Sequence, residues 1–126
     1  MTVVLDAGAL VAVQRGDKEM IAVIKRERQA GRAPRTHGGV IGQVWRGGRG
    51  RQGNLARLLP GLEVHAIDEA LGRRCGALLG TAGGSDVIDA GVVLIAQDGD
   101  EIFTADPADL RDLARAAGMF VDLISI

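Results

Sequence analysis

Four aspartates, Asp6, Asp86, Asp89 and Asp106, each follow an expected strand or open an expected helix. In a parallel α/β sheet, strand carboxyl ends and helix amino ends gather at one edge, and ligands bind there. Several carboxylates meeting at that edge would repel one another unless a cation lay between them. Proteins typically hold Mg²⁺ with one or two carboxylates, waters and phosphate oxygens. The four aspartates therefore predict a site that depends on a divalent metal ion and takes a phosphate-bearing substrate.

Asp6 is the strongest single candidate for a metal ligand or catalytic group. It directly follows the apolar run 2–5, and the small residues at 7–9 leave open space around it. The alternative is a helix N-cap, a position where Asp is common.

Asp86 and Asp89 are three residues apart, so a helix would place both on one face, with Cβ atoms about 5–6 Å apart. The partial positive charge of a helix amino end favours acids there, so a cap followed by a second acid is the alternative. That alternative explains one aspartate better than two. The stretch 87–96 is nearly all apolar, so we expect a buried helix whose first acids face a cleft.

Asp106 lies between an expected strand and Pro107, where it could be a ligand, an N-cap or a turn residue. Asp109 completes an Asp-x-x-Asp pattern similar to a capping box, and we interpret it as structural. Thr104 is a candidate for lining the site, because its hydroxyl could donate to a ligand carboxylate.

Size and composition indicate one domain, residues 1–126, of the α/β class. The chain is 47% hydrophobic but has only two Phe and one Trp, so Val, Ile, Leu and Ala must build the core, which suits parallel strands covered by helices. Cys75 is the single cysteine, and its helical setting favours a buried, inert thiol. No signal-like or membrane-length apolar segment is apparent, so we expect a cytoplasmic protein without membrane contact.

Strand and helix patterns alternate along the chain, which predicts a mainly parallel sheet. Strands are expected at 2–5, 34–37, 62–67, 101–104 and 119–126. Helices are expected at 7–14, from Asp17 to Gly31, around Val40 to Trp45, around Leu55 to Leu59, from Asp68 to about Leu79 with Gly80 closing it, at 87–96 after a cap at Ser85 or Asp86, and from Pro107 to Ala117.

Charge is unevenly distributed although the net charge is only −1. Nine basic residues and one acid lie between Lys25 and Arg57, whereas eight acids and one arginine lie between Asp86 and Asp112. The basic half suits phosphate binding, and the alternative is an ordinary solvated surface. The stretch 48–53 matches G-x-G-x-x-G but follows a helix, so we interpret it as an arginine-bearing loop rather than a dinucleotide site. Trp45 is expected to pack in the protein.

Several other chemistries find no support in the sequence. His37 and His65 lack metal-ligand spacing, and no Ser/His or Cys/His pair indicates covalent hydrolysis. A phosphoacceptor domain would need a lysine after a late strand, and the two lysines, Lys18 and Lys25, are both early.

Three segments together resemble the PIN-domain family, and within it the VapC-type toxin ribonucleases. They are Val3-Val4-Leu5-Asp6, Ser85-Asp86-Val87-Ile88-Asp89-Ala90 and Phe103-Thr104-Ala105-Asp106-Pro107. The resemblance implies a three-layer α/β/α sandwich, an acidic Mg²⁺ or Mn²⁺ pocket, cleavage of RNA, a small antitoxin partner and a homodimer.

One position departs from that family. Its members usually carry a glutamate in the helix after the second strand, where this chain has Gln43. An amide oxygen can bind Mg²⁺ but brings no negative charge. Asp86 could compensate, or the chain could bind metal weakly and not cleave.

Our first hypothesis is therefore a metal-dependent endoribonuclease, the toxin of a toxin–antitoxin pair. Asp6, Asp89 and Asp106 would hold one or two ions, with Asp86 as a further ligand or base. Arg46, Arg49 and Arg51 would hold the RNA backbone. The alternative is a PIN-scaffold module that binds RNA or a protein without cutting.

Overall fold

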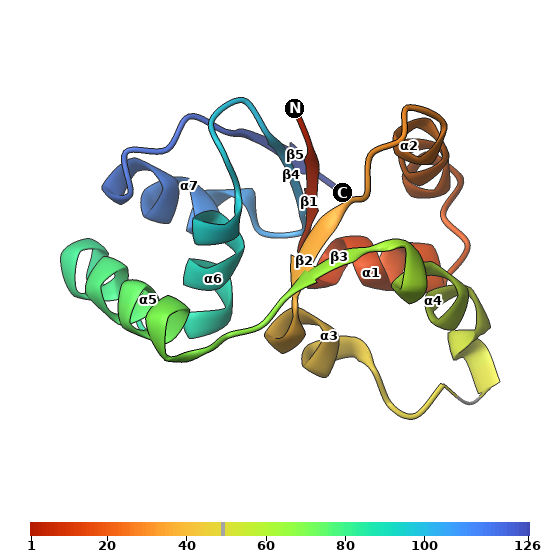
Figure 1. Cartoon of the computed structure of the whole chain (residues 1–126), viewed down its shortest axis with the longest axis horizontal. Helices are drawn as coiled ribbons and strands as arrows, with labels where there is room; N and C mark the ends of the chain where they lie inside the picture. The colour runs from red at the N-terminus through yellow and green to blue at the C-terminus, as the bar shows by residue number, and fades with distance from the viewer. Residues whose placement is uncertain (49) are drawn as a thin grey trace.

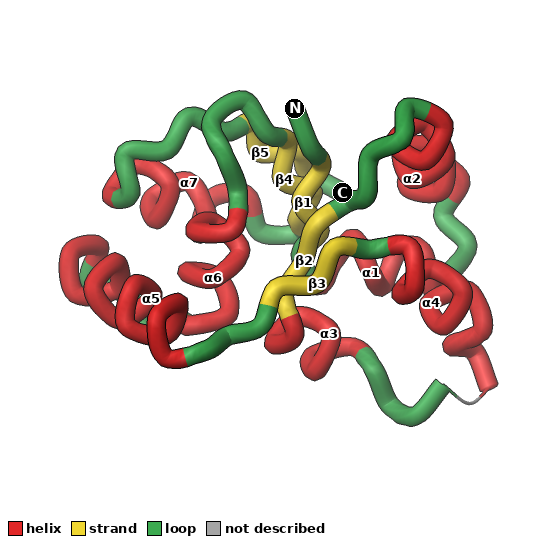
Figure 2. The backbone as a smooth tube through the Cα atoms, viewed as in Figure 1, coloured by secondary structure: helices red, strands yellow, loops and turns green. Residues whose placement is uncertain are grey.

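The computed structural model describes residues 1–48 and 50–126 and contains one parallel sheet (Figure 2). The strand order across the sheet is β3-β2-β1-β4-β5. The strands are β1 (Val3–Leu5), β2 (Arg35–His37), β3 (Glu63–His65), β4 (Glu101–Thr104) and β5 (Asp122–Ser125). All five expected strands form, and every pairing is parallel, as predicted.

Helices cover both faces of this sheet (Figure 1). Helices α1 to α4 lie on one side and α5, α6 and α7 on the other. The helices are α1 (Ala7–Gln14), α2 (Lys18–Gln29), α3 (Gly38–Val44), α4 (Gly53–Leu58), α5 (Glu69–Ala82), α6 (Val87–Ile95) and α7 (Pro107–Ala116), with short 3-10 turns η1 (Gly50–Gln52) and η2 (Leu59–Gly61). The architecture is the predicted three-layer α/β/α sandwich.

The central strands are buried because both of their faces are covered. Val3, Val4 and Leu5 of β1 are fully buried, as is Ile102 of β4. A strand buried on both sides reads as a continuous apolar run rather than an alternating one. For this reason the apolar run at 2–5 could be recognised in the sequence as a buried strand.

Several helix starts follow from side-chain caps. Asp17 accepts a hydrogen bond from the Met20 amide at 2.9 Å, and Asp68 accepts one from the Leu71 amide at 2.9 Å. Pro107 occupies the first turn of α7, where its fixed φ suits a helix. These predicted starts are confirmed.

Some predicted boundaries are wrong. Helix α5 does not end at Gly80 but continues to Ala82, because the left-handed residue that terminates it is Gly83, with φ of 80°. The last strand is Asp122–Ser125 rather than 119–126, and β3 is Glu63–His65 rather than 62–67. Apolar residues that flank a strand extend the sequence pattern beyond the residues that pair.

The order of the strands creates a switch point between β1 and β4. The chain leaves β1 through α1 on one face, whereas it leaves β4 through α7 on the other (Figure 1). Leu5 pairs with Phe103, so the carboxyl ends of the two strands lie side by side. Open α/β sheets place their ligands in the crevice at such a point.

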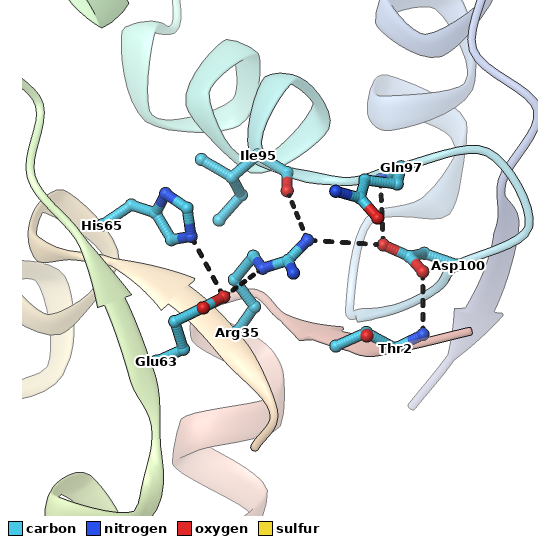
Figure 3. Close-up of polar contacts among 7 residues, drawn as sticks. All are labelled: Thr2, Arg35, Glu63, His65, Ile95, Gln97 and Asp100. Atoms are coloured by element: carbon cyan, nitrogen blue, oxygen red, sulfur yellow. Dashed lines mark hydrogen bonds and ion pairs between the residues drawn. The ribbon is translucent and has the colours of Figure 1, made fainter. Parts of the chain in front are cut away.

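The opposite edge of the sheet is closed by a polar network around Arg35 (Figure 3). The guanidinium of Arg35 donates to the Ile95 carbonyl at 2.9 Å and to Glu63, and lies 3.7 Å from Asp100. The buried Asp100 accepts from the Thr2 amide at 2.8 Å. The network ties the amino ends of four strands to the end of α6, so it holds the sheet edge without forming part of the aspartate cluster.

Among the described residues, no single helix is long and apolar enough to cross a membrane. The pair α5 and α6, bent by 107°, passes the test by length and composition only.

Candidate functional site

Asp6 lies at the switch point and joins β1 to β4. It is 8% exposed, and its two carboxylate oxygens accept hydrogen bonds from the Ala7 amide at 2.8 Å and the Thr104 hydroxyl at 2.9 Å. The Asp6 amide donates to the Phe103 carbonyl at 3.1 Å. Asp6 is therefore the N-cap of α1 and also a buried carboxylate at the carboxyl edge of the sheet.

Thr104 links two of the predicted aspartates. Its hydroxyl oxygen donates to Asp6 and accepts from the amide of Asp106 at 3.0 Å. This buried threonine thus fixes the orientation of the Asp6 carboxylate and of the turn that carries Asp106.

Asp86 and Asp89 stand on the first turn of α6. Asp86, rather than Ser85, caps the helix by accepting from the Asp89 amide at 3.1 Å. Asp86 is exposed, whereas Asp89 is half-buried. Asp86 is therefore the helix cap that the alternative required, and Asp89 lies within reach of further negative charge.

The pKa of Asp89 shows which carboxylates the fold brings together. Burial, and then the negative charges of Asp86, Asp6, Asp109 and Asp106, raise the pKa of Asp89 from 3.8 to about 6. The charges of the other three predicted aspartates, Asp6, Asp86 and Asp106, therefore all reach Asp89. An acid whose neighbours are all acids favours its neutral form unless a cation compensates.

Asp109 does not have the structural role in a capping box that the sequence predicted. The interpretation as a capping box is wrong, because the Asp106 side chain makes no capping hydrogen bond and the Asp106 amide bonds to Thr104 instead. Asp109 adds its charge to the field at Asp89. The sequence held a sign of this proximity, because Asp109 lies three residues after Asp106 and residues at that spacing share a helix face.

A hollow of about 320 Å³ opens beside the first turn of α6. The end of α5, the start of α6 and the side of α7 form it. Four acids line it: Asp86, Asp89, Asp109 and Asp112. The two acids at the start of α6 face a cleft, as expected. Asp109 and Asp112, which form the other wall of this hollow, were not predicted from the sequence to line it.

The donor set suits a hard cation, but the side chains do not enclose one. Carboxylate oxygens are what Mg²⁺ and Mn²⁺ prefer. Within residues 1–48 and 50–126, however, no three His, Cys, Asp or Glu side chains are close enough to form a metal-binding group. The residues therefore fit an ion held by one or two carboxylates with the rest of its shell made of water, rather than a cage of protein ligands.

The predicted arginines are not part of this field, because every charge that shifts Asp89 comes from an aspartate. Arg46 caps α3 instead: its guanidinium donates to the carbonyls of Gly42 at 3.1 Å, Gln43 at 3.2 Å and Trp45 at 2.7 Å. Arg51 is exposed on η1, and Arg49 lies outside the described residues.

Gln43 is exposed near the end of α3. It is neutral, so it adds nothing to the negative charge that surrounds Asp89. The helix that carries it starts at the carboxyl end of β2, on the same edge of the sheet as Asp6.

Some arginines of the basic half of the chain are paired with acids of the same protein. Glu27 is fully buried and binds Arg32 at 2.8 Å and Arg26 at 3.5 Å. The hydrogen bond from Arg32 lowers the pKa of Glu27 despite its burial. Part of the positive charge in this half of the sequence therefore serves ion pairs within the protein. A count of charged residues along the sequence could not reveal which of them are paired.

His37, which the sequence analysis set aside, lies beside the site. It is fully buried at the end of β2, and its Nδ1 accepts from the Gly39 amide at 3.1 Å while Nε2 lies 2.9 Å from the Ile88 carbonyl. Burial lowers the pKa of His37, although the Ile88 carbonyl and the charge of Asp6 oppose this shift. The imidazole is therefore neutral at pH 7, with its proton on Nε2.

Two further predictions are confirmed. Trp45 packs against the hydrophobic core, and its ring lies where a Cβ on Gly48 would fall. Cys75 is fully buried, and burial raises the pKa of its thiol, so it is an inert core residue.

Comparison with known proteins supports the fold. No protein-family model matches the chain, and no curated protein matches it. Among solved structures, the chain is similar to one described as VapBC2 from Rickettsia felis bound to a DNA fragment from their promoter. The TM-score is 0.70 at 12% sequence identity, and the match covers 98% of each chain. At this identity the likeness shows a shared fold, in agreement with the PIN-like architecture expected from the sequence.

Proposed function

We propose that this protein is a divalent-metal-dependent endoribonuclease and the toxin of a type II toxin–antitoxin pair. The observation that carries the proposal is the gathering of acids around the first turn of α6, where Asp86, Asp89, Asp109 and Asp112 line one hollow and where burial and neighbouring aspartates raise the pKa of Asp89 to about 6. Such a concentration of uncompensated acid at the switch point of an α/β sheet is costly for folding, and perturbed acids in a cleft are typical of functional sites.

Each aspartate has a distinct part in the proposed site. Asp6 and Asp89 would hold Mg²⁺ or Mn²⁺, with Asp106 and Asp86 reaching the ion through water. The bound ion would lower the pKa of a water molecule and stabilise charge developing on the phosphate. Thr104 would keep one oxygen of Asp6 oriented by its hydrogen bond at 2.9 Å.

RNA would approach this edge with its backbone held by arginines. Arg46 and Arg51 follow α3 in the chain and are both exposed, and Arg49 lies between them in sequence. Contacts from Lys and Arg to phosphates supply affinity without sequence specificity. This part of the proposal predicts salt-sensitive RNA binding.

A small antitoxin protein is the proposed partner. The similar structure from Rickettsia felis is a VapBC2 assembly bound to promoter DNA, and the present chain shares its fold over 98% of its length. From the resemblance of the sequence to the PIN-domain family we also propose a homodimer, and we propose that it acts in the cytoplasm.

A binding module that does not cleave is the second candidate. Two observations favour it: Gln43 adds no charge, and no three acids in the described ranges stand at metal-binding distance. Such a protein would bind RNA or its partner equally well with or without Mg²⁺.

The deciding experiment is RNA cleavage with Mg²⁺ or Mn²⁺ against an EDTA control. Asp6→Asn and Asp89→Asn should abolish cleavage. The matched control is Asp98→Asn, an exposed acid whose hydrogen bond from the Phe120 amide an Asn oxygen can still accept. Cleavage that survives both EDTA and Asp6→Asn would refute the mechanism. Tight RNA binding without cleavage in any metal would decide for the binding module, and a gain of activity in Gln43→Glu would identify the missing charge as the cause.

A further inference from the structure

The first turn of α6 must be held at a fixed distance from β1 if Asp89 and Asp6 are to share an ion. The two residues come from different layers, Asp89 from helix α6 and Asp6 from the position directly after the central strand β1. The hydrogen bond between Asp86 and the Asp89 amide orients the turn internally but does not tie it to the sheet. Another contact has to set that distance.

His37 makes a contact of this kind. It ends β2, the strand next to β1, and its Nε2 lies 2.9 Å from the carbonyl of Ile88, the residue before Asp89. Because Nδ1 accepts from the Gly39 amide, Nε2 carries the proton and donates to Ile88. One imidazole thus joins the sheet edge, the start of α3 and the first turn of α6.

Two glycines make room for this junction. A Cβ on Gly91, in α6, would lie 2.8 Å from His37 Nε2, and a Cβ on Gly39 would lie 2.4 Å from Ile88 Cδ1. Glycine inside a helix is less favourable than alanine, because its backbone loses more conformational freedom on folding. The close approach of α6 to His37 therefore requires a residue that would otherwise be unfavourable in the helix.

We propose that His37 is a positioning residue that sets the distance between Asp89 and Asp6, and thereby the affinity of the site for its metal. The metal part of this inference rests on the proposed function. The imidazole touches neither substrate nor ion. It acts through the Ile88 carbonyl, as outer-shell partners of metal ligands commonly do, and loss of such partners typically costs 10–100-fold in metal affinity.

Two substitutions separate this role from simple capping of α3. In His37→Gln the side-chain amide can reach the Ile88 carbonyl but no longer caps α3. In His37→Asn the shorter side chain keeps the cap on the Gly39 amide and loses Ile88. A role in positioning predicts that the Asn variant binds Mn²⁺ about 10–100-fold more weakly, while the Gln variant stays close to wild type. A capping role predicts the opposite order.

Amide hydrogen exchange tests the same junction without metal. The Asn variant should exchange faster than the Gln variant at the first turn of α6, while the amides of β1 remain equally protected. Gly91→Ala provides a third variant: it introduces a better helix former but displaces the imidazole, and it should weaken Mn²⁺ binding about 10-fold.

Calorimetric titration with MnCl₂ and hydrogen exchange by mass spectrometry decide the outcome. Wild-type protein that binds no Mn²⁺ would refute the proposed function, and the exchange comparison would then judge the junction alone. Equal exchange in the Asn and Gln variants, or unchanged Mn²⁺ affinity in the Asn variant and in Gly91→Ala when wild type binds, would overturn the role of His37.

Discussion

Replacing Asp89 with Asn should stabilise the metal-free protein at neutral pH. The folded pKa of about 6 exceeds the reference value of 3.8, so the ionised carboxylate is disfavoured in the fold. Two pKa units correspond to about 3 kcal/mol, and partial solvent exposure reduces this to roughly 1–2 kcal/mol. Asparagine removes the charge and keeps the shape of the side chain.

The pH dependence of this effect has a definite sign. Protonation of Asp89 stabilises the fold fully below pH 3.8, and that contribution is lost as pH rises through about 6. The stability difference between Asp89→Asn and wild type should therefore be largest above pH 7 and shrink to about a fifth of that value at pH 4.

Urea unfolding in EDTA at pH 4, 5, 6 and 7.5 measures this difference, with Asp98→Asn as the charge control. Asp98 is exposed, and its substitution should change stability by less than about 0.5 kcal/mol at every pH. An Asp89→Asn variant that is less stable than wild type at pH 7.5, or whose advantage does not vary with pH, would show that burial and the neighbouring carboxylates do not act on Asp89 as described.

Three further outcomes are expected from the contacts around the site. Thr104→Val should destabilise the fold by about 1–3 kcal/mol in urea unfolding, because it leaves the buried Asp6 oxygen without its donor, whereas Thr104→Ser should recover most of the loss. Gly8→Ala should cost about 1–3 kcal/mol in the same assay, since the new Cβ would lie 2.8 Å from the Ala105 Cβ. Gly76→Ala should raise the melting temperature, with a gain of about 0.5–1 kcal/mol, because it adds a methyl group to α5 in open space; an unchanged or lower melting temperature would indicate that this face of α5 is covered in solution.

Local signals in the sequence identified most of the elements. A cap such as Asp17 or Asp68 acts on an amide three residues away, so the residues that decide it are adjacent in the chain. The buried run at 2–5 and the proline at the start of α7 are equally local. The predicted boundaries that were wrong are the end of helix α5 at Gly80 and the extent of the last strand at 119–126. They depend on which residues turn or pair in the folded protein.

The site divides in the same way. Sequence alone placed Asp6, Asp86, Asp89 and Asp106 at the carboxyl edge of a parallel sheet, because each follows a strand or opens a helix. It could not show that Asp6 meets Thr104, which is 98 residues distant, since that bond requires β1 and β4 to be neighbours.

Tertiary structure decided the remaining features. Packing of α7 beside α6 turns Asp109 and Asp112 into a wall of the acidic hollow. Folding also buries His37 between two glycines and binds Arg32 and Arg46 to partners within the protein. Residue type and spacing determine which groups are available for chemistry, whereas the distances between layers determine which of them meet, because those distances depend on side-chain packing across the whole core.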